Sequence, residues 1–312
     1  MTILIDPPVW PAHGTHFSHV VSDTSLEELH AFAQRAGLPP QAFDHDHYDA
    51  PLRVYDSLVE LGAVPVSASE LTRRLRGSGL RVPARDRIER IEARLHTAFE
   101  AVLPEQLSLG RELLERWQEP HRHYHDLRHL NQVLTSIDTI SAAAGLGDSR
   151  DGRTAMRVAR LAAWWHDAIY EGIPGEDEHA SAELAARQLT GIVEDDVVQR
   201  VHRAILATAD HATVAADVAQ SPSEVDVGVS MLLDADLSVL ARPEAGYQRY
   251  TLDVRHEYAH VPEHDFIAGR TRILEGMLAT PQLYITDFGV QNWEAKARKN
   301  IASELTRLKM HR

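Results

Sequence analysis

The spacing of apolar and polar positions divides the chain into two regions with different expected structure. In residues 1–83, short apolar runs of strand length alternate with amphipathic runs of helix length. This alternation indicates a small α/β domain built on a parallel or mixed sheet. Strands are expected at 2–6 and 63–66, a short strand and loop at 41–49, and helices at 25–37, 52–61 and 67–75.

The pattern changes after the glycines at 77 and 79 and Pro83, a segment that predicts a domain boundary. Between residues 84 and 312, almost every periodic segment repeats its apolar positions at helical spacing. The expected fold class is therefore α+β overall, with an all-α helical bundle preceded by the small α/β domain. Helices are expected at 88–103, 107–117, from the histidine-rich stretch to 140, 154–170, 177–189, 195–210, 227–240, 247–260, 266–278 and 292–308, with loops at 145–152 and 212–224.

One expected helix, residues 154–170, is apolar on nearly every face. Such a helix belongs in the centre of a bundle. It carries His166 and Asp167, so this doublet is expected to be buried. Because a buried aspartate has to be paired, hydrogen-bonded or bound to a metal ion, the doublet is a candidate functional site.

Composition restricts the chemistry that such a site can use. The 312 residues include 32 Lys and Arg, 46 Asp and Glu and 19 His, with a formal net charge of −14 and no Cys. Disulfides and thiolate metal sites are therefore excluded, and any metal ion must be held by imidazole and carboxylate groups. The acidic charge argues against binding of nucleic-acid backbones, which requires a basic face. A small anionic substrate remains compatible if a metal ion or arginines neutralise it locally.

The sequence shows no targeting segment and no membrane segment. The N-terminal residues lack the basic region and the apolar run of a signal peptide. No apolar stretch reaches the roughly 20 residues that a membrane span requires. A cytoplasmic location is the default expectation, and self-association into a homo-oligomer stays open.

The densest group of candidate ligands runs from His121 to His129, where four histidines fall within nine residues. On a helix, His125 and His129 are four residues apart and share a face. Neutral imidazole and carboxylate hold Zn, Mn, Fe or Ni in hydrolytic sites. Together with the His166-Asp167 doublet, this stretch predicts a divalent metal site. A buried polar network without a metal ion is the alternative.

The order of these residues resembles the HD superfamily of metal-dependent phosphohydrolases, in which a histidine precedes a His-Asp doublet and a distant aspartate follows on a later helix. The resemblance covers about residues 87–308, and its local motifs are similar to a bacterial group of predicted metal-dependent phosphohydrolases. The matching segments are Tyr124-His-Asp-Leu-Arg-His129, Trp165-His-Asp-Ala-Ile-Tyr170, Asp177-Glu-His-Ala-Ser-Ala182, Ala207-Thr-Ala-Asp-His211, Leu233-Asp-Ala-Asp-Leu-Ser238 and Arg255-His-Glu-Tyr258.

This resemblance implies a ligand set for a divalent ion, which would be Mn, Fe, Ni, Co, Zn or Mg. Asp236 is preferred to Asp234 as the last ligand, because residues 235–238 are similar to the corresponding segment of cyclic-nucleotide phosphodiesterases. A second metal ion is implied at His179 and His211. The ligands implied for the first ion are His129, His166, Asp167 and Asp236.

Catalytic roles follow from the same resemblance. The phosphodiesterases carry a Tyr-His-Asn-x-x-x-His motif, which makes His125 the general acid, although Asp126 replaces the Asn here. Glu178 would position water or orient a ligand histidine. The catalytic residues implied are His125, Asp167 and Glu178.

The reaction implied is hydrolysis of a phosphoester of a nucleotide or related phosphorylated metabolite by a metal-activated water. Cleavage of a phosphodiester or pyrophosphate is the alternative reaction. A metal- or nucleotide-binding regulatory protein without turnover is the alternative class. Arginine forks match phosphate oxygens, so Arg128, Arg255 and Arg270 are candidates for phosphate binding, with surface or helix-capping ion pairs as the other interpretation.

The first region resembles a small uncharacterised bacterial domain that begins with Ile5-Asp-Pro-Pro8 and Trp10-Pro-Ala-His-Gly14. Five histidines and four aspartates are concentrated there: His13, His16, His19, His45, His47, Asp6, Asp44, Asp46 and Asp49. Ligands of α/β units usually bind at the carboxyl ends of strands. A metal or phosphate site is therefore predicted, with a polar loop over a strand end as the alternative. The residues assigned to it are Asp6, His13, His16 and His19.

Overall fold

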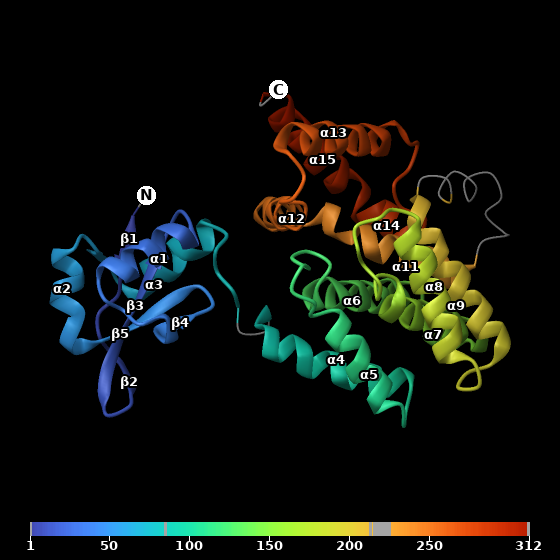
Figure 1. Ribbon diagram of the computed structural model, residues 1–312, viewed down its shortest axis with the longest axis horizontal. Helices are drawn as coiled ribbons and strands as arrows, with labels where there is room; N and C mark the ends of the chain where they lie inside the picture. Colours follow the sequence, from blue (N-terminus) through green and yellow to red (C-terminus); the bar gives the residue numbers. More distant parts are fainter. Residues whose placement is uncertain (1, 84–85, 212–213, 215–225, 311–312) are drawn as a thin grey trace. The chain divides into compact units, whose positions relative to one another are not determined.

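Figure 1 shows the computed structural model, which describes residues 2–83, 86–211, 214 and 226–310. The chain forms two compact units, Met1–Arg87 and Ile88–Arg312. The first unit contains a sheet and the second is helical, so the predicted α+β class is confirmed. The loop predicted at 212–224 lies outside the described residues, apart from residue 214.

The first unit is built on a mixed, six-stranded sheet in the order β4-β5-β3-β1-β6, with β2 paired to β3. Strand β1 runs parallel to β6, and the other strand pairs are antiparallel. The strands are β1 (Ile3–Ile5), β2 (Trp10–Ala12), β3 (Thr15–Ser22), β4 (Phe43–Asp44), β5 (His47–Pro51) and β6 (Val64–Pro65).

Strand β2 and the central strand β3 were not predicted from the sequence. Strand β3 reads Thr-His-Phe-Ser-His-Val-Val-Ser, with polar side chains at most positions, so its sequence shows no clear apolar alternation. It is a strand because it pairs with both β1 and β5. Ser18 and Ser22 are buried within it, which tertiary pairing allows and local propensity does not predict.

Side-chain alternation along β3 divides the first unit into two cores. Val20 joins a cluster with the helices α1 and α2, whereas Val21 joins one with α3. His19 shares the α3 side of the sheet with Val21, because the two are two residues apart. Helical segments of this unit are α1 (Leu26–Arg35), η1 (Pro40–Ala42), η2 (Leu52–Val54), α2 (Tyr55–Glu60) and α3 (Ala68–Gly77).

The second unit consists of helices and short 3-10 turns. A larger core is formed by α4 to α9 together with α11, and a smaller one by η7, α12, α13 and α15. The described segments are α4 (Ile88–Val102), α5 (Leu107–Arg116), α6 (Leu127–Ala143), η4 (Leu146–Asp148), α7 (Arg150–Trp165), α8 (Glu176–Leu189), α9 (Asp195–Ala207), η5 (Thr208–Asp210), α11 (Val227–Asp236), η7 (Leu237–Ala241), α12 (Glu244–Glu257), α13 (Glu263–Ala279), α14 (Asp287–Asn292) and α15 (Glu294–Met310).

Helix α7 is the centre of the larger core, as its apolar surface predicts. It contacts α4, α6, α8, α9 and α11, and Trp164 and Trp165 are fully buried. The predicted limits of this helix, 154 and 170, were wrong. It begins at Arg150, because Ser149 caps it by accepting a hydrogen bond from the backbone of Gly152. It ends at Trp165, so the His-Asp doublet follows the helix instead of lying inside it.

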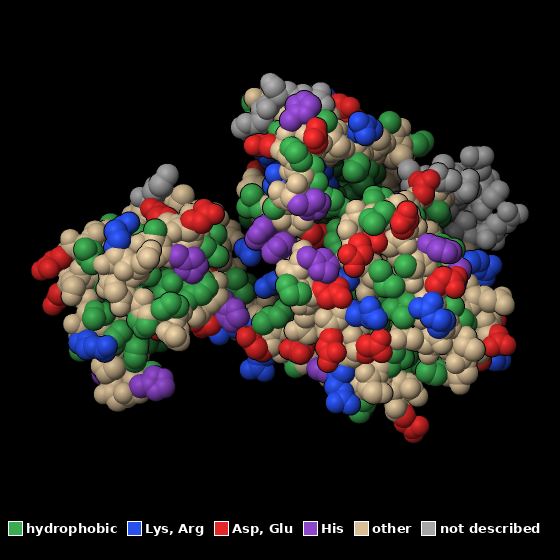
Figure 2. Space-filling model, viewed as in Figure 1, with side chains coloured by type: hydrophobic (Ala, Val, Ile, Leu, Met, Phe, Trp, Pro, Cys, Tyr) green, Lys and Arg blue, Asp and Glu red, His purple; other side chains and the backbone are tan. Residues whose placement is uncertain are grey.

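Figure 2 shows acidic, basic and histidine side chains interspersed over the visible face of each unit. Of the described helices, none combines the length and the apolar character that a bilayer crossing would require.

Candidate metal centre

Four side chains predicted as metal ligands meet at one point of the helical unit. His129 stands in the first turn of α6, His166 and Asp167 follow α7, and Asp236 is the last residue of α11. The Nε2 atom of His129 lies 3.2 Å from Nε2 of His166 and 3.1 Å from Oδ1 of Asp236. Oδ2 of Asp167 lies 3.2 Å from Nε2 of His166 and 3.7 Å from Nε2 of His129.

A hydrogen bond decides which nitrogen of His166 faces this point. Its Nδ1 lies 2.9 Å from the carbonyl oxygen of Ala163, which can only accept. Nδ1 therefore carries a hydrogen, and in the neutral ring the lone pair is on Nε2, facing His129. An ion held tetrahedrally at about 2.1 Å separates its ligand atoms by roughly 3.4 Å. The separations of the two histidines from each other and from the two carboxylates, 3.1 to 3.8 Å, are close to that value, so the group fits a divalent ion.

The carboxylates of Asp167 and Asp236 place two negative charges close together at this point, so a positive charge is stabilised there. Burial opposes ionisation of Asp167, but the charge and hydrogen bond of His166 lower its pKa to about 2. The pKa of Asp236 also lies well below its usual value, because hydrogen bonds to the neighbouring histidines outweigh burial. The same carboxylates raise the pKa of His166 against the effect of burial. A divalent cation supplies such a positive charge directly.

His211, one of the two residues predicted for a second ion, joins the group. It follows η5, and its Nε2 lies 3.1 Å from Oδ2 of Asp236. The other carboxylate oxygen of Asp236, Oδ1, is the one that lies near His129. His179, the other residue predicted for a second ion, is exposed on α8 near Glu183 and is not brought into the group.

The two aspartates of α11 have different surroundings. Asp234 accepts hydrogen bonds from the backbone of Ile285 at 2.7 Å and from the backbone and hydroxyl of Thr286 at 2.8 and 2.6 Å. Burial raises its pKa to about 6. Its carboxylate holds the segment before α14 in place, so Asp236 is the aspartate of this helix that faces the histidines.

His125, the predicted general acid, is held by a carboxylate to which the sequence analysis gave no role. Oε1 of Glu257 lies 2.5 Å from Nδ1 of His125 and accepts a hydrogen bond from the hydroxyl of Tyr170 at 2.6 Å. Oε2 accepts three backbone N–H bonds from residues 123–125. Burial lowers the pKa of His125, but Glu257 and Asp167 raise it above its ordinary value.

The sequence signal for Glu257 was present in the Arg255-His-Glu-Tyr258 segment, which was among the matching motifs. What the sequence did not show is that the end of α12 returns to the histidine stretch, more than 130 residues earlier in the chain. Residues far apart in sequence come together only through tertiary packing, so spacing alone could not pair Glu257 with His125.

A second residue without a predicted role, Arg122, ties the histidine stretch to the doublet. Its guanidinium donates to the carbonyl oxygens of His125 at 3.2 Å, Asp167 at 2.7 Å and Ala168 at 3.3 Å. It also lies over the ring of Tyr170. One buried side chain therefore fixes the backbone at His125, the predicted general acid, and at Asp167, a predicted metal ligand.

The start of α8 holds the loop that follows the doublet. Asp177 accepts hydrogen bonds from the backbone of Glu171 at 3.0 Å and of Ile173 at 2.9 Å. Glu178 accepts one from the backbone of Gly175 at 2.6 Å. The carboxylate of Glu178 thus caps α8, which differs from the predicted role in positioning water or a ligand histidine.

The three arginines predicted to hold phosphate are each engaged with protein groups. Arg128 and Arg255 match the alternative interpretation, the first as an exposed ion pair and the second as a helix-end contact, whereas Arg270 forms a buried ion pair that neither interpretation predicted. Their partners are Asp126 for Arg128 at 2.5 Å, the carbonyl oxygens of Tyr258 and Val261 for Arg255 at 2.6 and 3.2 Å, and Glu304 for Arg270 at 2.9 Å.

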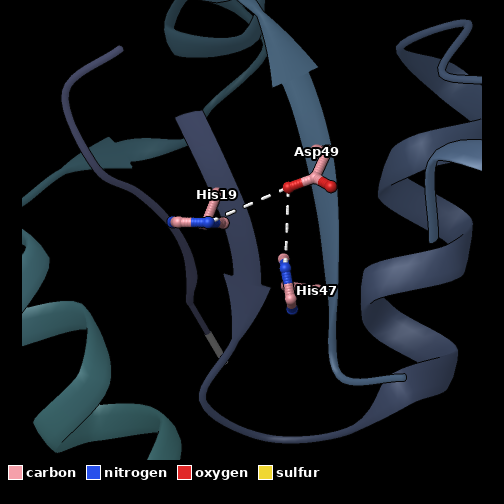
Figure 3. A group of neighbouring side chains, drawn as sticks. All are labelled: His19, His47 and Asp49. Atoms are coloured by element: carbon pink, nitrogen blue, oxygen red, sulfur yellow. Dashed lines mark ion pairs between the residues drawn. The ribbon is translucent and has the colours of Figure 1, made fainter. Parts of the chain in front are cut away.

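A second group of histidines and aspartates lies on the sheet of the first unit (Figure 3). Nε2 of His19 and Nε2 of His47 lie 3.8 and 3.6 Å from Oδ1 of Asp49. Nδ1 of His19 lies 2.9 Å from Oδ2 of Asp6. Burial lowers the pKa of His47, but its contacts with two aspartates raise it to about 9. Two of the four residues predicted for this site, Asp6 and His19, therefore belong to the group.

The other two predicted residues, His13 and His16, do not belong to it. Both are exposed on the β2–β3 hairpin, where His13 adopts a left-handed turn conformation with φ of 48°. His47 and Asp49 stand in the places that these residues were expected to fill. The reason is strand register, since β3 and β5 pair with His19 directly opposite Asp49, and β3 was not predicted.

Comparison with known proteins bears on the first unit. Residues 3–78 match a family model described as a protein of unknown function, DUF4031. This match supports the resemblance of the first unit to a small uncharacterised domain. It covers about a quarter of the chain and does not extend into the helical unit, for which no HD-family model matches. No curated protein and no solved structure matches the chain.

Proposed function

We propose that the helical unit is a metal-dependent phosphohydrolase of the HD type. The observation that supports this proposal is the convergence of His129, His166, Asp167 and Asp236 on one point from three helices. Two ionised carboxylates and two imidazoles at such short separations are costly to bury unless a cation lies among them. When bound, a divalent ion lowers the pKa of a coordinated water and polarises a phosphoryl oxygen.

His125 is the proton donor of the proposed reaction. Glu257 orients its ring through Nδ1 and stabilises its protonated form. When the bond between phosphorus and the leaving oxygen breaks, that oxygen takes a proton from His125. The hydroxyl of the attacking water stays on phosphorus, and the other proton of that water passes to solvent, from which His125 is protonated again. Glu257 remains ionised because Tyr170 and three backbone N–H groups stabilise its charge.

The charges around the site favour a substrate with a single phosphoester. Asp167 and Asp236 are ionised, and the three arginines predicted for phosphate binding are engaged with protein groups. The ion and the protonated His125 therefore supply positive charge for the substrate. We infer that a nucleoside monophosphate or a similar phosphorylated metabolite is a better substrate than a pyrophosphate or a nucleic acid.

Phosphate release from a panel of nucleotides and sugar phosphates, with Mn, Co, Ni, Zn or Mg added to metal-free protein, tests this function. His166→Ala and Asp167→Ala are expected to lower release by more than about 100-fold, since changing even an outer partner of a metal ligand costs 10–100-fold. His123→Ala is the matched control. It lies in the same stretch, but its ring stacks on His256 at a centroid distance of 3.7 Å, so activity is expected to persist.

Two results would contradict the proposal. A wild-type protein that binds metal and nucleotide but releases no phosphate with any of the ions would be a binding protein without turnover. A protein whose metal content is unchanged by His129→Ala together with His166→Ala holds no ion at this site.

A further inference from the structure

We propose that the first unit holds a divalent metal ion of the zinc type, with His19, His47 and Asp49 as ligands and one position open to a pocket. This site lies in the unit that matches the family of unknown function, and it shares no residue with the proposed phosphohydrolase centre. The proposed metal site can therefore be tested independently of the proposed phosphohydrolase function.

The sheet places the three ligands on one face without help from a loop. His47 and Asp49 are two residues apart on β5, so their side chains point to the same side of the sheet. His19 lies directly opposite Asp49 in the antiparallel pairing of β3 with β5. Figure 3 shows both imidazole rings directed toward the same oxygen of Asp49. Ligands carried on strands keep a more constant geometry than ligands carried on loops.

Each histidine is oriented by its own buried carboxylate. Nδ1 of His19 lies 2.9 Å from Asp6, and Nδ1 of His47 lies 2.7 Å from Asp46. Only 1% of each of these aspartates is exposed. An ionised carboxylate only accepts hydrogen bonds, so each ring donates Nδ1–H and keeps Nε2 for a ligand. Metal-binding histidines are commonly held by such outer carboxylates, which also raise the basicity of the ring.

The outer carboxylates are themselves fixed, so the arrangement is constrained beyond the ligands. Asp6 accepts hydrogen bonds from the indole of Trp10 at 3.0 Å and from the backbone of His19 at 2.6 Å. Asp46 accepts from the backbone of Val82 at 2.5 Å and from Arg81 at 3.0 and 3.1 Å. A polar loop over a strand end, the simpler interpretation of this region, does not require two separate carboxylate–histidine pairs that converge on a third carboxylate.

The donor set indicates which ions fit. Two imidazole nitrogens and one carboxylate oxygen, without sulfur, suit Zn²⁺ or another first-row divalent ion. The donor atoms all lie within 4.8 Å of one another, compared with roughly 3.4 Å between tetrahedral ligands of zinc. Small rotations of the three side chains would close this difference. Three protein ligands leave a fourth position free, as catalytic zinc sites do and structural zinc sites do not.

The free position faces a cavity of about 340 Å³ between the sheet and α3. The ligands line this cavity together with Leu71 and Leu75 of α3 and the side chains of Arg81 and Arg87. Arg87 pairs with Asp44 at 3.0 Å, and its buried Nε has no hydrogen-bond partner. A small oxyanion such as phosphate would complete the coordination of the ion and accept a hydrogen bond from this Nε–H. We therefore assign a small oxyanion as the second ligand of the site.

Metal content of the full chain tests the ion. After equilibration with Zn²⁺ and removal of excess metal, the His19→Ala, His47→Ala double variant is expected to hold one ion per chain fewer than wild type. The His16→Ala variant is the control, because His16 is exposed on the same strand and is not a ligand. The His129→Ala, His166→Ala double variant reports the helical centre separately. The difference of one ion at the first site is expected whether or not the helical centre binds metal.

A milder variant guards against loss of folding. The side chain of Asp49 is 44% exposed, so Asp49→Asn keeps the shape of the sheet and removes only a charge. It is expected to weaken Co²⁺ binding at this site by at least tenfold. Inorganic phosphate is expected to shift the visible absorption of Co²⁺ bound to the His129→Ala, His166→Ala variant, in which the helical centre no longer contributes. Equal metal content in wild type and the His19, His47 variant, or unchanged Co²⁺ affinity in Asp49→Asn, would overturn the metal site. A Co²⁺ spectrum of the His129, His166 variant that does not respond to phosphate would overturn the oxyanion.

Discussion

At the residue scale, both candidate centres depend on what lies behind each histidine. In the first unit, Asp6 and Asp46 accept from Nδ1 of the two ligand rings. In the helical unit, a backbone carbonyl takes that role for His166, and Glu257 takes it for His125. The group behind the ring decides which nitrogen is free and how readily the ring holds a proton. A carboxylate behind the ring therefore favours the protonated form that a donor such as His125 requires, and it also orients His19 and His47, whereas a neutral carbonyl orients His166.

Replacing Glu257 with Gln tests the role of His125 as proton donor. The carboxylate raises the pKa of His125, so its loss lowers that pKa. A general acid must be protonated, so the fall in kcat/KM at high pH is expected to move to lower pH in Glu257→Gln. Removal of a group that supports proton transfer is expected to reduce kcat by about 10²-fold, the low end of the usual contribution of general acid catalysis.

Glu244→Gln is the control for this measurement, because Glu244 lies on the same helix, α12, and is exposed. Its pH profile should match that of wild type. A Glu257→Gln variant with reduced kcat but an unshifted pH profile would show that Glu257 only supports the fold around residues 123–125.

Replacing Asp6 with Asn tests the outer carboxylate of the proposed ion in the first unit. Asn keeps the size of the side chain but removes the charge that orients Nδ1 of His19. Zn²⁺ affinity at this site is expected to fall by about 10–100-fold, as it does when outer partners of metal ligands are changed. Competition with a chromophoric chelator measures it. Asp23→Asn changes another hydrogen-bonded carboxylate of the same unit, bound to Thr2 and Arg74, and should leave the affinity unchanged.

Part of each site could be predicted from single residues, and part could not. The order of the motifs was sufficient to predict His129, His166, Asp167 and Asp236 as candidate metal ligands, because each lies in a short segment with a recognisable pattern. Glu257 and Arg122 were missed because their partners lie far away in the sequence or are backbone groups. The three arginines assigned to phosphate show the reverse difficulty, since a sequence does not reveal which carboxylate or carbonyl a guanidinium contacts.

At the element scale, the ends of helices determine where the candidate ligands of the helical unit lie. Asp126 caps α6 by accepting from the backbone of Arg128 and His129, which sets the first turn that carries His129. The end of α7 at Trp165 places the doublet in a turn, and the end of α11 presents Asp236. Helical periodicity predicted these elements, but caps and ends depend on local contacts that shift the limits by several residues. Strand β3 was missed because its pattern is set by its neighbours.

Replacing Asp226 with Ala tests how far α11 depends on its N-terminal cap. Asp226 accepts from the backbone of Gly228 at 2.8 Å and pairs with Arg200 at 2.5 and 2.9 Å. Loss of a cap and a partly buried ion pair is expected to lower the free energy of unfolding by about 1–3 kcal/mol at pH 7. Denaturation followed by tryptophan fluorescence reports this, because four of the five tryptophans lie in the helical unit.

The difference in the free energy of unfolding between wild type and Asp226→Ala is expected to depend on pH. The pKa of Asp226 is lowered in the folded chain: burial alone would raise it, but Arg200 and backbone N–H groups outweigh burial. Its contribution is therefore present above the unfolded value of about 3.9 and is lost as pH falls through the folded value. The gap between wild type and Asp226→Ala should shrink toward pH 3. The exposed Asp195→Ala serves as the control, and a gap that is unchanged at pH 3 would show that the charge of Asp226 is not responsible.

At the scale of the whole molecule, each unit carries its own core and its own group of candidate ligands. The cores of the first unit involve only residues before 87, and those of the second only residues after 87. The change from strand-length to helix-length patterns, with glycines and a proline between them, predicted a boundary after residue 83. Composition predicted histidine and carboxylate as the metal ligands. The order of the motifs and the concentration of histidines in the first region predicted two separate groups. The membership of the first group could not be predicted, because strand register brings His47 and Asp49, instead of His13 and His16, to His19.

Separate expression of residues 1–87 and 88–312 is expected to yield two folded proteins. Their far-ultraviolet circular dichroism spectra, added together, should match that of the full chain, because no core is divided. The first piece is small, so its stability is expected to be marginal. Zn²⁺ at 100 times its dissociation constant should stabilise that piece by about 2.7 kcal/mol through binding to the folded form alone, and calorimetry would detect the higher melting temperature. Division at residue 145 is the control, because it separates α6 from α7 within one core and should abolish folding. A piece 88–312 that stays unfolded by itself would show that the helical unit requires the first unit to reach its structure.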